Sequence, residues 1–433
     1  MSAGPDATPN CALDAALQAA IAAGDARRHE VTATLADRRT DLPLRFWRQA
    51  AHFTTPAADA AMARKAVEGG TAPVGRMLER LGLSAGDLAE TLELPVAVIE
   101  SALATPARAP MVMLDGEDAI APGDAVAERA LAVAADTFAT ADWGAATPTP
   151  SLRFYRPPGF AIETTVRDLY TLLWRLRDLT DSPAVFPLDG IVMPKLDHPE
   201  EVDLVHDLLD RAEHDLGLIP GRLRVAYLIE GGWAATQLPA LAQRAAPRLA
   251  ALIFGIADYS ADLGLPAIGT DHPLAVWARA EMIATAGAVG VPAIDGMTLA
   301  YPVADPNLDA AANRARWLER MRLVYQDTVT ARDLGMSGKW VGHPAQLFAV
   351  LLAFEAGQSD ASLEAEAQKL EAYQAALDAD LGATMIDGVM SDRATDRHAR
   401  VVLRRATATG RFPAGRAHAL GLISDDELRE MTP

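Results

Sequence analysis

Eight short β-type runs, each followed by a helical segment, constrain the fold of this chain more than any other feature of its sequence. The runs are QAAHFTTP (from 49), MVMLDGE (from 111), SLRFY (from 151), GIVMPK (from 190), RVAYLIE (from 224), AALIFG (from 250), VPAIDG (from 291) and GKWVG (from 338). Strands that alternate with helices are typical of a parallel sheet, and eight of them favour a closed barrel over an open sheet. We therefore predict an α/β protein built on a TIM (β/α)8 barrel.

Three segments fall outside this alternation and divide the chain. We predict an N-terminal helical extension (1–47), a barrel (48–356) with a helical insertion after its first strand (57–110), and a C-terminal helical tail (357–433). The insertion resembles a helix-turn-helix in its spacing, but residues 77–104 hold one basic residue, Arg80, against five acidic ones. A helix-turn-helix that binds the phosphates of DNA needs an excess of basic over acidic residues. The insertion is therefore predicted to be a small helical hairpin packed on the barrel.

Charge and cysteine content exclude several classes of partner and site. The chain holds 39 Lys and Arg against 58 Asp and Glu, a net charge of −19, and contains no basic tract. This argues against binding to nucleic acid or to an anionic membrane. One cysteine, Cys11, excludes an intramolecular disulfide and a cysteine-based zinc cluster. Because neither a membrane-spanning apolar run nor the basic start of a signal peptide is evident, we expect a soluble cytoplasmic protein.

Polar side chains gather where the predicted strands end. The second run ends in Asp115, Glu117 and Asp118, the third holds Arg153 and Arg156, the fourth ends in Lys195, and Glu230 and Asp258 follow the fifth and sixth. Parallel strands of a barrel end at one common face, so Glu230 and Asp258 are expected to converge there. Two convergent carboxylates are suitable ligands for Mg²⁺ or Mn²⁺. The pattern predicts a site for metal-assisted chemistry on an anionic substrate.

Each of these residues also has a structural interpretation. Glu230 or Asp258 alone could cap the helix that follows, but their joint occurrence after adjacent strands favours the metal site. Asp115, Glu117 and Asp118 cannot all join that pair as ligands without an excess of negative charge. We therefore assign Glu117 and Asp118 to hold metal-bound water or a basic side chain.

Two further positions have a functional and a structural interpretation. Gly231 and Gly232 lie between a strand and a helix, where backbone N–H groups could receive a substrate carboxylate, or could simply form a turn. His343 has no second histidine at metal-ligand spacing, so a structural role is favoured. Motifs of serine hydrolases, P-loop nucleotidases and dinucleotide dehydrogenases are absent from the sequence.

Several stretches, in order, resemble the motifs of one known superfamily. They are VMLDGEDAI (112–120), LRFY (152–155), GIVMPK (190–195), LIE (228–230), FGIADYSADLG (254–264), IDG (294–296), GKWVGHPAQ (338–346) and TMID (384–387). They are similar to D-L-E-D-A-V, V-R-V-N, G-I-V-L-P-K, I-E-T, F-G-x-x-D-L-x-x-D-L-G, the I-D-G stretch, G-K-x-x-I-H-P-x-Q and the terminal M-I-D element. Residues 111–408 thereby resemble the HpcH/HpaI aldolase and citrate lyase β-subunit superfamily, which includes malyl-CoA lyases and is related to malate synthase.

The resemblance implies a fold, a cofactor and a reaction. The fold is a TIM barrel, and Mg²⁺ held by Glu230 and Asp258 is chelated by a 2-oxo acid. Arg153 is the implied clamp of the enolate or oxo acid. Asp387 is the implied acid and base, supplied by a neighbouring subunit of a homo-oligomer, a trimer or a hexamer. We expect a carbon–carbon lyase whose catalytic candidates are Arg153, Asp387, Glu117, Asp118 and Lys195.

Some residues of the predicted substrate pocket differ from the motifs of the superfamily. Tyr155 replaces the asparagine of V-R-V-N, and Gly231 and Gly232 replace the residues after the glutamate of I-E-T-P. Together with Arg153, these residues are the candidates for substrate binding, in a pocket that differs from that of other members. The partner of the 2-oxo acid is an acyl-CoA or, in the alternative, a free acid as in pyruvate-type aldolases. A non-catalytic barrel that serves as a subunit or binding module is a further alternative.

Overall fold

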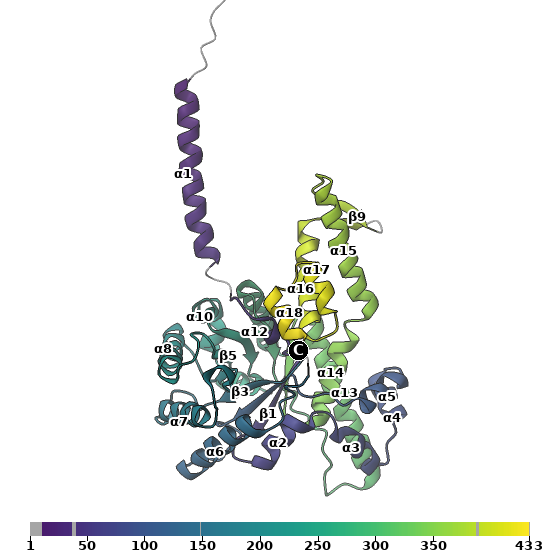
Figure 1. Cartoon of the computed structure of the whole chain (residues 1–433). Coiled ribbons are helices and arrows are strands. Elements are labelled where there is room, and N and C mark those ends of the chain that lie inside the picture. Colours follow the sequence, from purple (N-terminus) through teal and green to yellow (C-terminus); the bar gives the residue numbers. More distant parts are fainter. Residues whose placement is uncertain (1–10, 37–39, 148, 387–388, 433) are drawn as a thin grey trace, which may run out of the picture.

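The computed structural model describes residues 11–36, 40–147, 149–386 and 389–432, and its centre is a closed parallel barrel (Figure 1). Each strand pairs in parallel with the next, and β8 pairs with β1 to close the ring. The strands are β1 (Ala51–Pro56), β2 (Met111–Asp115), β3 (Leu152–Arg156), β4 (Gly190–Met193), β5 (Arg224–Ile229), β6 (Leu249–Phe254), β7 (Ala293–Asp295) and β8 (Gly338–Val341). The predicted TIM barrel is confirmed.

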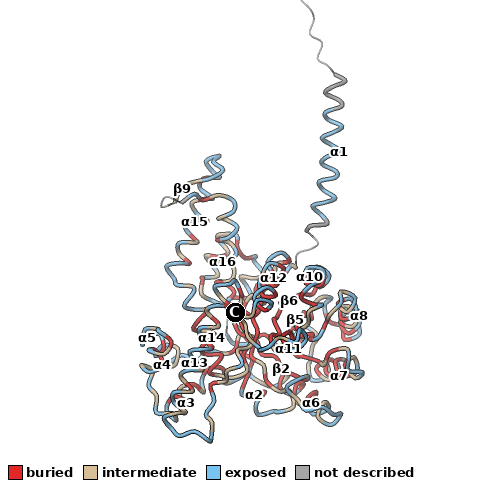
Figure 2. The backbone as a smooth tube through the Cα atoms, turned by 180° about the vertical axis from the view of Figure 1, so that it is seen from behind, coloured by how far each residue is buried: buried red, intermediate tan, exposed pale blue. Residues whose placement is uncertain are grey.

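Helices cover the outside of the barrel. They are α6 (Asp124–Thr140), α7 (Thr165–Asp178), η2 (Pro183–Val185), α8 (Pro199–Leu216), α9 (Gly232–Thr236), α10 (Leu238–Ala245), α11 (Ile256–Asp262), α12 (Pro273–Val289), α13 (Ala310–Leu334) and α14 (Pro344–Ala356). Because helices cover one face of each strand and side chains fill the barrel inside, the strands read as nearly continuous apolar runs. The residues of β2 and β6 are buried along their whole length, and Figure 2 shows buried residues concentrated in the strands.

The register of β2 and β3 decides which side chains face the barrel interior. Asp115, the last residue of β2, lies opposite Arg156, the last residue of β3. The Arg156 guanidinium lies over the ring of Trp340 on β8, 5.5 Å from its centroid. Because β8 does not neighbour β3, this contact crosses the interior. Side chains alternate between the two faces of a strand, so Arg153 and Tyr155 point outward.

Four helices form the insertion between β1 and β2. They are α2 (Ala60–Gly69), α3 (Pro73–Leu81), α4 (Ala85–Leu92) and α5 (Val96–Ala104). Helix α4 contacts α13, and α3 contacts α14. The apolar side chains of Leu88 and Ile99 are fully buried in the main core. The insertion is therefore part of the barrel's outer layer.

The C-terminal tail has a core of its own. It contains α15 (Asp360–Asp378), the antiparallel strands β9 (Thr384–Ile386) and β10 (Val389–Ser391), α16 (Arg393–Ala408), α17 (Ala414–Ala419) and α18 (Asp425–Met431). The short helix η1 (Leu44–Trp47) links the two cores: Leu44 is buried with the tail helices, whereas Phe46 packs at 6.3 Å, edge to face, on Phe154 of the barrel. The tail is thereby fixed to the segment that precedes β1.

The N-terminal helix α1 (Cys11–Ala36) extends away from the barrel (Figure 1). Its residues 17–33 are all exposed. Among the described helices, none combines the length and the apolar character that crossing a membrane requires.

Candidate active site

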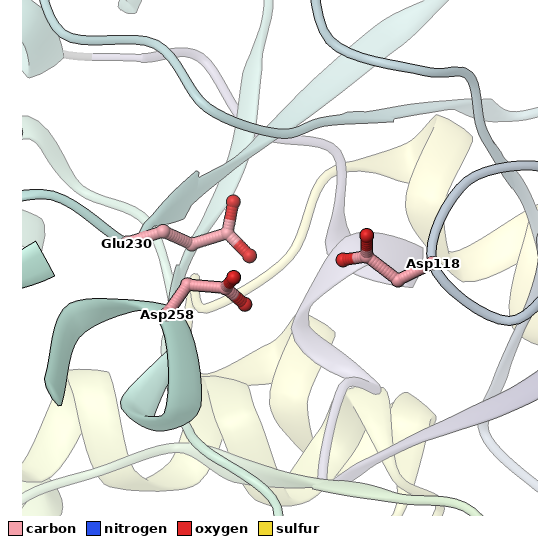
Figure 3. A group of neighbouring side chains, drawn as sticks. All are labelled: Asp118, Glu230 and Asp258. Carbon is pink, nitrogen blue, oxygen red and sulfur yellow. The ribbon is translucent and has the colours of Figure 1, made fainter. Parts of the chain in front are cut away.

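Three carboxylates from three different segments converge at the carboxyl ends of the strands. Glu230 follows β5 directly, Asp258 lies in the first turn of α11 after β6, and Asp118 lies in the loop after β2. One oxygen of each lies within 4.8 Å of the others. Figure 3 shows Glu230 and Asp258 side by side, with the carboxylate of Asp118 opposite them. The structure therefore brings together the two predicted metal ligands and adds a third carboxylate.

The backbone around Glu230 is shaped to hold its side chain. A Cβ on Gly255 would lie 2.3 Å from Cγ of Glu230, so only glycine leaves the room that the side chain occupies. The backbone N–H of Lys195 donates to Oε2 of Glu230 at 3.1 Å. Lys195 makes this bond from a left-handed backbone conformation, φ 53°, which is strained for a residue with a side chain. Such strain is typical of functional sites.

Burial and like charge act together on Glu230. Its exposure is 4%. Burial raises the pKa of Glu230 to about 8; Arg156 lowers it, while Asp258 and Glu117 add to the rise. A carboxylate held so close to other carboxylates is stabilised as an anion when a cation joins the cluster. The electrostatics of the site thus favour a bound cation.

Arg156 is the buried cation of the site. Its Nη2 lies 2.5 Å from Oδ2 of Asp115 and its Nε donates to Oδ1 of Asp115 at 2.8 Å, a bidentate pair. Its Nη1 lies 3.1 Å from Glu117 and 3.4 Å from Asp118. Burial alone lowers the pKa of Arg156, but Asp115 outweighs it and holds the pKa above its ordinary value. The guanidinium is fixed in place beside the three convergent carboxylates.

Lys195 is the second cation and has more contact with solvent. Its Nζ lies 2.8 Å from Glu117 and 3.1 Å from Asp118. Burial lowers the pKa of Lys195, but the hydrogen bonds to these two carboxylates outweigh it and raise the pKa above its usual range. Asp118 therefore contacts both cations while its carboxylate faces Glu230 and Asp258.

We call these seven residues the acidic mouth: Asp115, Glu117, Asp118, Glu230, Asp258, Arg156 and Lys195. When all are ionised, five carboxylates face two cations, a surplus of three negative charges. Oxygen ligands of this kind suit Mg²⁺ and Mn²⁺, and the surplus charge would be reduced by either ion. The donor set of the acidic mouth therefore fits a divalent metal.

The structure corrects the predicted positions of Arg153 and Tyr155. Arg153 lies over the ring of Trp143, 5.5 Å from its centroid, and its backbone N–H donates to Asp189, which precedes β4. This is the amino-terminal end of the barrel. Tyr155 is buried on the outer face of β3, and a Cβ on Gly116 would lie 2.2 Å from its hydroxyl. Both side chains point outward, and among the described residues neither forms a hydrogen bond or an ion pair with the acidic mouth. Arg156, one residue beyond Tyr155, does.

The structure also corrects the prediction for the two glycines. The N–H of Gly232 donates to Asp262 at 2.7 Å, so it is already occupied. A Cβ on Gly231 would lie 2.7 Å from Oδ1 of Asp197. The carboxylates of Asp197 and Asp262, which lie beside these glycines, would repel a substrate carboxylate. The interpretation of Gly231 and Gly232 as turn residues is favoured, because the chain must pass close to Asp197 here.

Two other predicted positions complete the comparison with the sequence. Asp387 lies outside the residues that the structure describes, which resume at residue 389. His343 accepts a hydrogen bond from the N–H of Ala345 at 3.2 Å and caps α14, which confirms its structural interpretation. Asp115 and Trp340 were not assigned a role from the sequence. A role for Asp115 could have been inferred from the pairing of the strands. Asp115 is the last residue of β2 and lies opposite Arg156, the last residue of β3, so an ion pair between them is expected.

A closed β/α barrel with convergent carboxylates at the carboxyl ends of its strands defines a class of barrel enzymes. A family model described as Domain of unknown function (DUF6986) matches residues 45–432, and the chain belongs to this family.

Named relatives place the family in a wider group. L-malyl-CoA/beta-methylmalyl-CoA lyase of Cereibacter sphaeroides (strain ATCC 17025 / ATH 2.4.3) is 29% identical over 317 residues, which cover 69% of this chain and 87% of the relative. Glyoxysomal malate synthase of Zea mays is 29% identical over 180 residues, 38% of this chain and 30% of the maize protein. The crystal structure of a citrate lyase from Burkholderia xenovorans LB400 has the same fold, with a TM-score of 0.56 and 24% identity over 88% of this chain and 97% of that one. These comparisons confirm the predicted superfamily and the predicted class of enzyme, a carbon–carbon lyase.

Proposed function

We propose that this protein is a carbon–carbon lyase that depends on Mg²⁺ or Mn²⁺ and acts on a 2-oxo acid and an acyl-CoA. One observation carries the proposal: Asp118, Glu230 and Asp258 converge within 4.8 Å beside the fixed guanidinium of Arg156. The names of the relatives, which include a malyl-CoA lyase, support a CoA thioester as the second reactant. The reaction would cleave a 3-hydroxyacyl thioester into a 2-oxo acid and a shorter acyl-CoA, or form it from them.

In this proposal Glu230 and Asp258 hold the metal, and Asp118 lies close enough to hold a metal-bound water or to join them. When bound, the metal supplies Lewis-acid polarisation of a substrate oxygen. Lys195 has a positioning role: its N–H orients Glu230, and its ammonium holds Glu117 and Asp118. The chain thus prepares the ligands before metal and substrate arrive.

Arg156, rather than Arg153, is the proposed clamp. Cleavage of the carbon–carbon bond leaves its electron pair on the thioester fragment as an enolate, whose oxygen gains negative charge in the transition state. A guanidinium already fixed by Asp115 can donate to that oxygen without reorganisation, and such interactions accelerate the reaction. Asp387 is the proposed acid and base for the protons of the hydroxyl and the enolate. We place it in the site of a neighbouring subunit of a homo-oligomer, a trimer or hexamer.

Metal binding tests the site directly. Isothermal titration of the metal-free protein with Mn²⁺ and with Mg²⁺ is expected to show saturable binding that Glu230→Gln and Asp258→Asn each weaken at least about tenfold, because each removes an anionic ligand. Asp215→Asn is the matched control, since Asp215 forms an exposed ion pair with Arg211. Unchanged affinity in both site variants would remove the metal assignment.

Substrate titrations separate the proposed reaction from its alternatives. With Mg²⁺ present, binding of acetyl-CoA and of a 2-oxo acid, followed by turnover of the pair, is expected. Binding of pyruvate without any binding of CoA or acetyl-CoA would favour a free 2-oxo-acid aldolase. Metal binding without turnover of any acyl-CoA and oxo-acid pair would favour a non-catalytic barrel.

A further inference from the structure

Three arginines from distant parts of the sequence converge at the amino-terminal end of the barrel. Arg45 lies in η1, Arg153 in β3 and Arg222 just before β5, and Asp189 lies among them. Arg45 lies 3.3 Å and Arg222 3.6 Å from Oδ1 of Asp189. Gathering three arginines at one place is unexpected in a chain whose net charge is −19. We call Arg45, Arg153 and Arg222 the arginine cluster.

The donors of the arginine cluster exceed the acceptors around it. Asp189 offers Oδ1 to Arg45 and Arg222, while its Oδ2 accepts from the backbone N–H of Arg153. Within the described residues, the Arg153 guanidinium forms neither an ion pair nor a hydrogen bond and lies against the ring of Trp143. Nη1 of Arg222 is buried, lies 3.6 Å from Asp189 and forms no hydrogen bond in the described structure, whereas Nη2 of Arg222 donates to the carbonyl of Phe186 at 3.0 Å. The guanidinium of Arg153 and Nη1 of Arg222 therefore hold N–H groups without a hydrogen-bond acceptor among the described residues.

The local charge of the arginine cluster also favours a bound anion. Three guanidinium groups against one carboxylate leave a local surplus of two positive charges. The nearby Arg48 cannot use its donors here, because they go to the carbonyls of Ala408 and Pro150 and to the sulfur of Met431. Burial is the main cause that lowers the pKa of Arg153, and Arg45 adds to it. A bound anion would remove this repulsion.

The arginine cluster is partly open to solvent. The side chains of Arg45 and Arg222 are 31% and 20% exposed, so solvent reaches both. Planar guanidinium groups match the oxygens of phosphate by paired hydrogen bonds, and several arginines around one anion are typical of phosphate recognition. A carboxylate monoanion would balance only half of the surplus charge.

We propose that the arginine cluster binds a dianion of the phosphate class, either inorganic phosphate or the phosphate group of a phosphomonoester. The site lies at the opposite end of the strands from the acidic mouth and does not depend on the proposed reaction. Its occupant would join η1, β3 and the segment before β5. Because η1 also contacts the C-terminal tail through Leu44, binding at this site would stabilise the attachment of the tail.

Titration with phosphate tests the proposal on the full-length protein. Inorganic phosphate and, separately, the phosphomonoester glycerol 3-phosphate, which shares no part with CoA, are added at constant ionic strength set with chloride, and heats and melting temperature are measured. Saturable binding and a melting temperature that rises with phosphate concentration are expected from linkage. Binding of both identifies free phosphate as sufficient, whereas binding of glycerol 3-phosphate alone identifies a phosphomonoester. The absence of saturable binding by either would overturn the proposal.

Substitutions of the arginines test whether phosphate binds at the arginine cluster. Arg153→Gln and Arg222→Gln are each expected to weaken phosphate binding at least about tenfold, because each removes a charged donor. Arg211→Gln is the matched control, since Arg211 is 70% exposed and pairs only locally with Asp215. Circular dichroism confirms that each variant is folded. Phosphate affinity that stays at the wild-type value in both cluster variants would overturn the proposal even if the wild type binds.

Discussion

Arg156 is the residue on which the proposed chemistry depends most. Its guanidinium is held by both oxygens of Asp115 and lies beside Glu117 and Asp118. Arg156→Lys keeps the charge but loses the paired donors, so kcat/KM is expected to fall about 10²–10³-fold, the usual cost of losing a fixed donor to a developing anion.

Steady-state kinetics with the acyl-CoA and oxo-acid pair checks this expectation. Arg211→Lys, on the surface, is the control and should stay close to the wild type. If Arg153→Lys caused the loss and Arg156→Lys did not, the clamp would be Arg153, as the sequence predicted. A change in KM alone would indicate that Arg156 binds the ground state of the substrate.

His52 makes the stability of the barrel depend on pH. It lies on β1 with 1% exposure, and both of its ring nitrogens lack a hydrogen-bond partner in the described structure. Burial lowers the pKa of His52 to about 3. The unfolded chain binds a proton below about pH 6.5 and the folded chain does not, so this histidine costs stability as pH falls, about 2 kcal/mol at pH 5.

Replacing His52 removes this cost. For His52→Leu, the loss of unfolding free energy between pH 7 and pH 5 is expected to be about 2 kcal/mol smaller than for the wild type. Urea unfolding at the two pH values measures it. The other buried histidines, such as His343, are present in both proteins and cancel in the comparison. Equal losses in the two proteins would show that His52 does not stay neutral in the fold.

At the scale of elements, the barrel could be predicted because its signal is local. Apolar runs and the helices between them stand in the sequence itself. Six of the eight predicted runs contain the whole observed strand, and the runs for β3 and β6 each miss one terminal residue, Arg156 and Leu249. Glu230 and Asp258 could be placed at one end because parallel strands end together. Side chains alternate between the two faces of a strand, so Arg153 and Arg156, three residues apart, point to opposite faces. The sequence does not show which of the two faces the barrel interior, and Arg153 was therefore placed on the wrong face. The arginine cluster could not be foreseen, since its members meet only in the folded chain.

Glu427 connects the C-terminal tail to the segment before the barrel. Its carboxylate forms a bidentate pair with Arg404 at 2.6 and 3.0 Å and accepts the N–H of Leu44 at 3.2 Å. Burial raises the pKa of Glu427, but Arg404 and the hydrogen bonds outweigh it and lower the pKa overall. Glu427→Gln is expected to weaken the attachment of α18 to η1 by about 1–3 kcal/mol.

Hydrogen exchange of the α18 and η1 amides checks this attachment, because faster exchange in both elements reports their separation. Glu371→Gln is the matched control: Glu371 pairs with Arg416 at 3.0 Å at an exposed position of the same tail, and its loss should cost less than about 1 kcal/mol. If α18 exchanged at the wild-type rate in Glu427→Gln, the tail would be held by its apolar core alone.

Over the whole molecule, the two ends of the barrel carry opposite charge. The acidic mouth has a surplus of three negative charges, and the arginine cluster has a surplus of two positive charges. Each surplus is a reason to expect a bound ion, since like charges held together in a partly buried site raise its free energy. A cation at one end and a dianion at the other would stabilise the same fold independently. The stabilising effects of metal and phosphate on the melting temperature should therefore add.

The proposed role of Asp387 concerns the assembly, because it requires a second copy of the chain. Glu230→Gln and Asp387→Asn are each expected to abolish turnover when present in all subunits. When equal amounts of the two variants assemble at random, about a quarter of the sites combine an intact Glu230 with an intact neighbouring Asp387. Turnover close to a quarter of the wild-type value is therefore expected from the mixture and from neither variant alone.

This complementation separates a base supplied in trans from one supplied in cis. If Asp387 acted in its own chain, each mixed site would lack one of the two groups, and the mixture would be as inactive as the variants. Light scattering of the mixture provides the control, because a monomer could not exchange groups between chains. Glu230→Gln mixed with Arg156→Lys is a second control: both changes affect the same chain's acidic mouth, so turnover should not exceed the average of the separate proteins. Recovery in the first mixture but not in the second would place Asp387 on the neighbouring subunit, and Glu230 and Arg156 together on one chain.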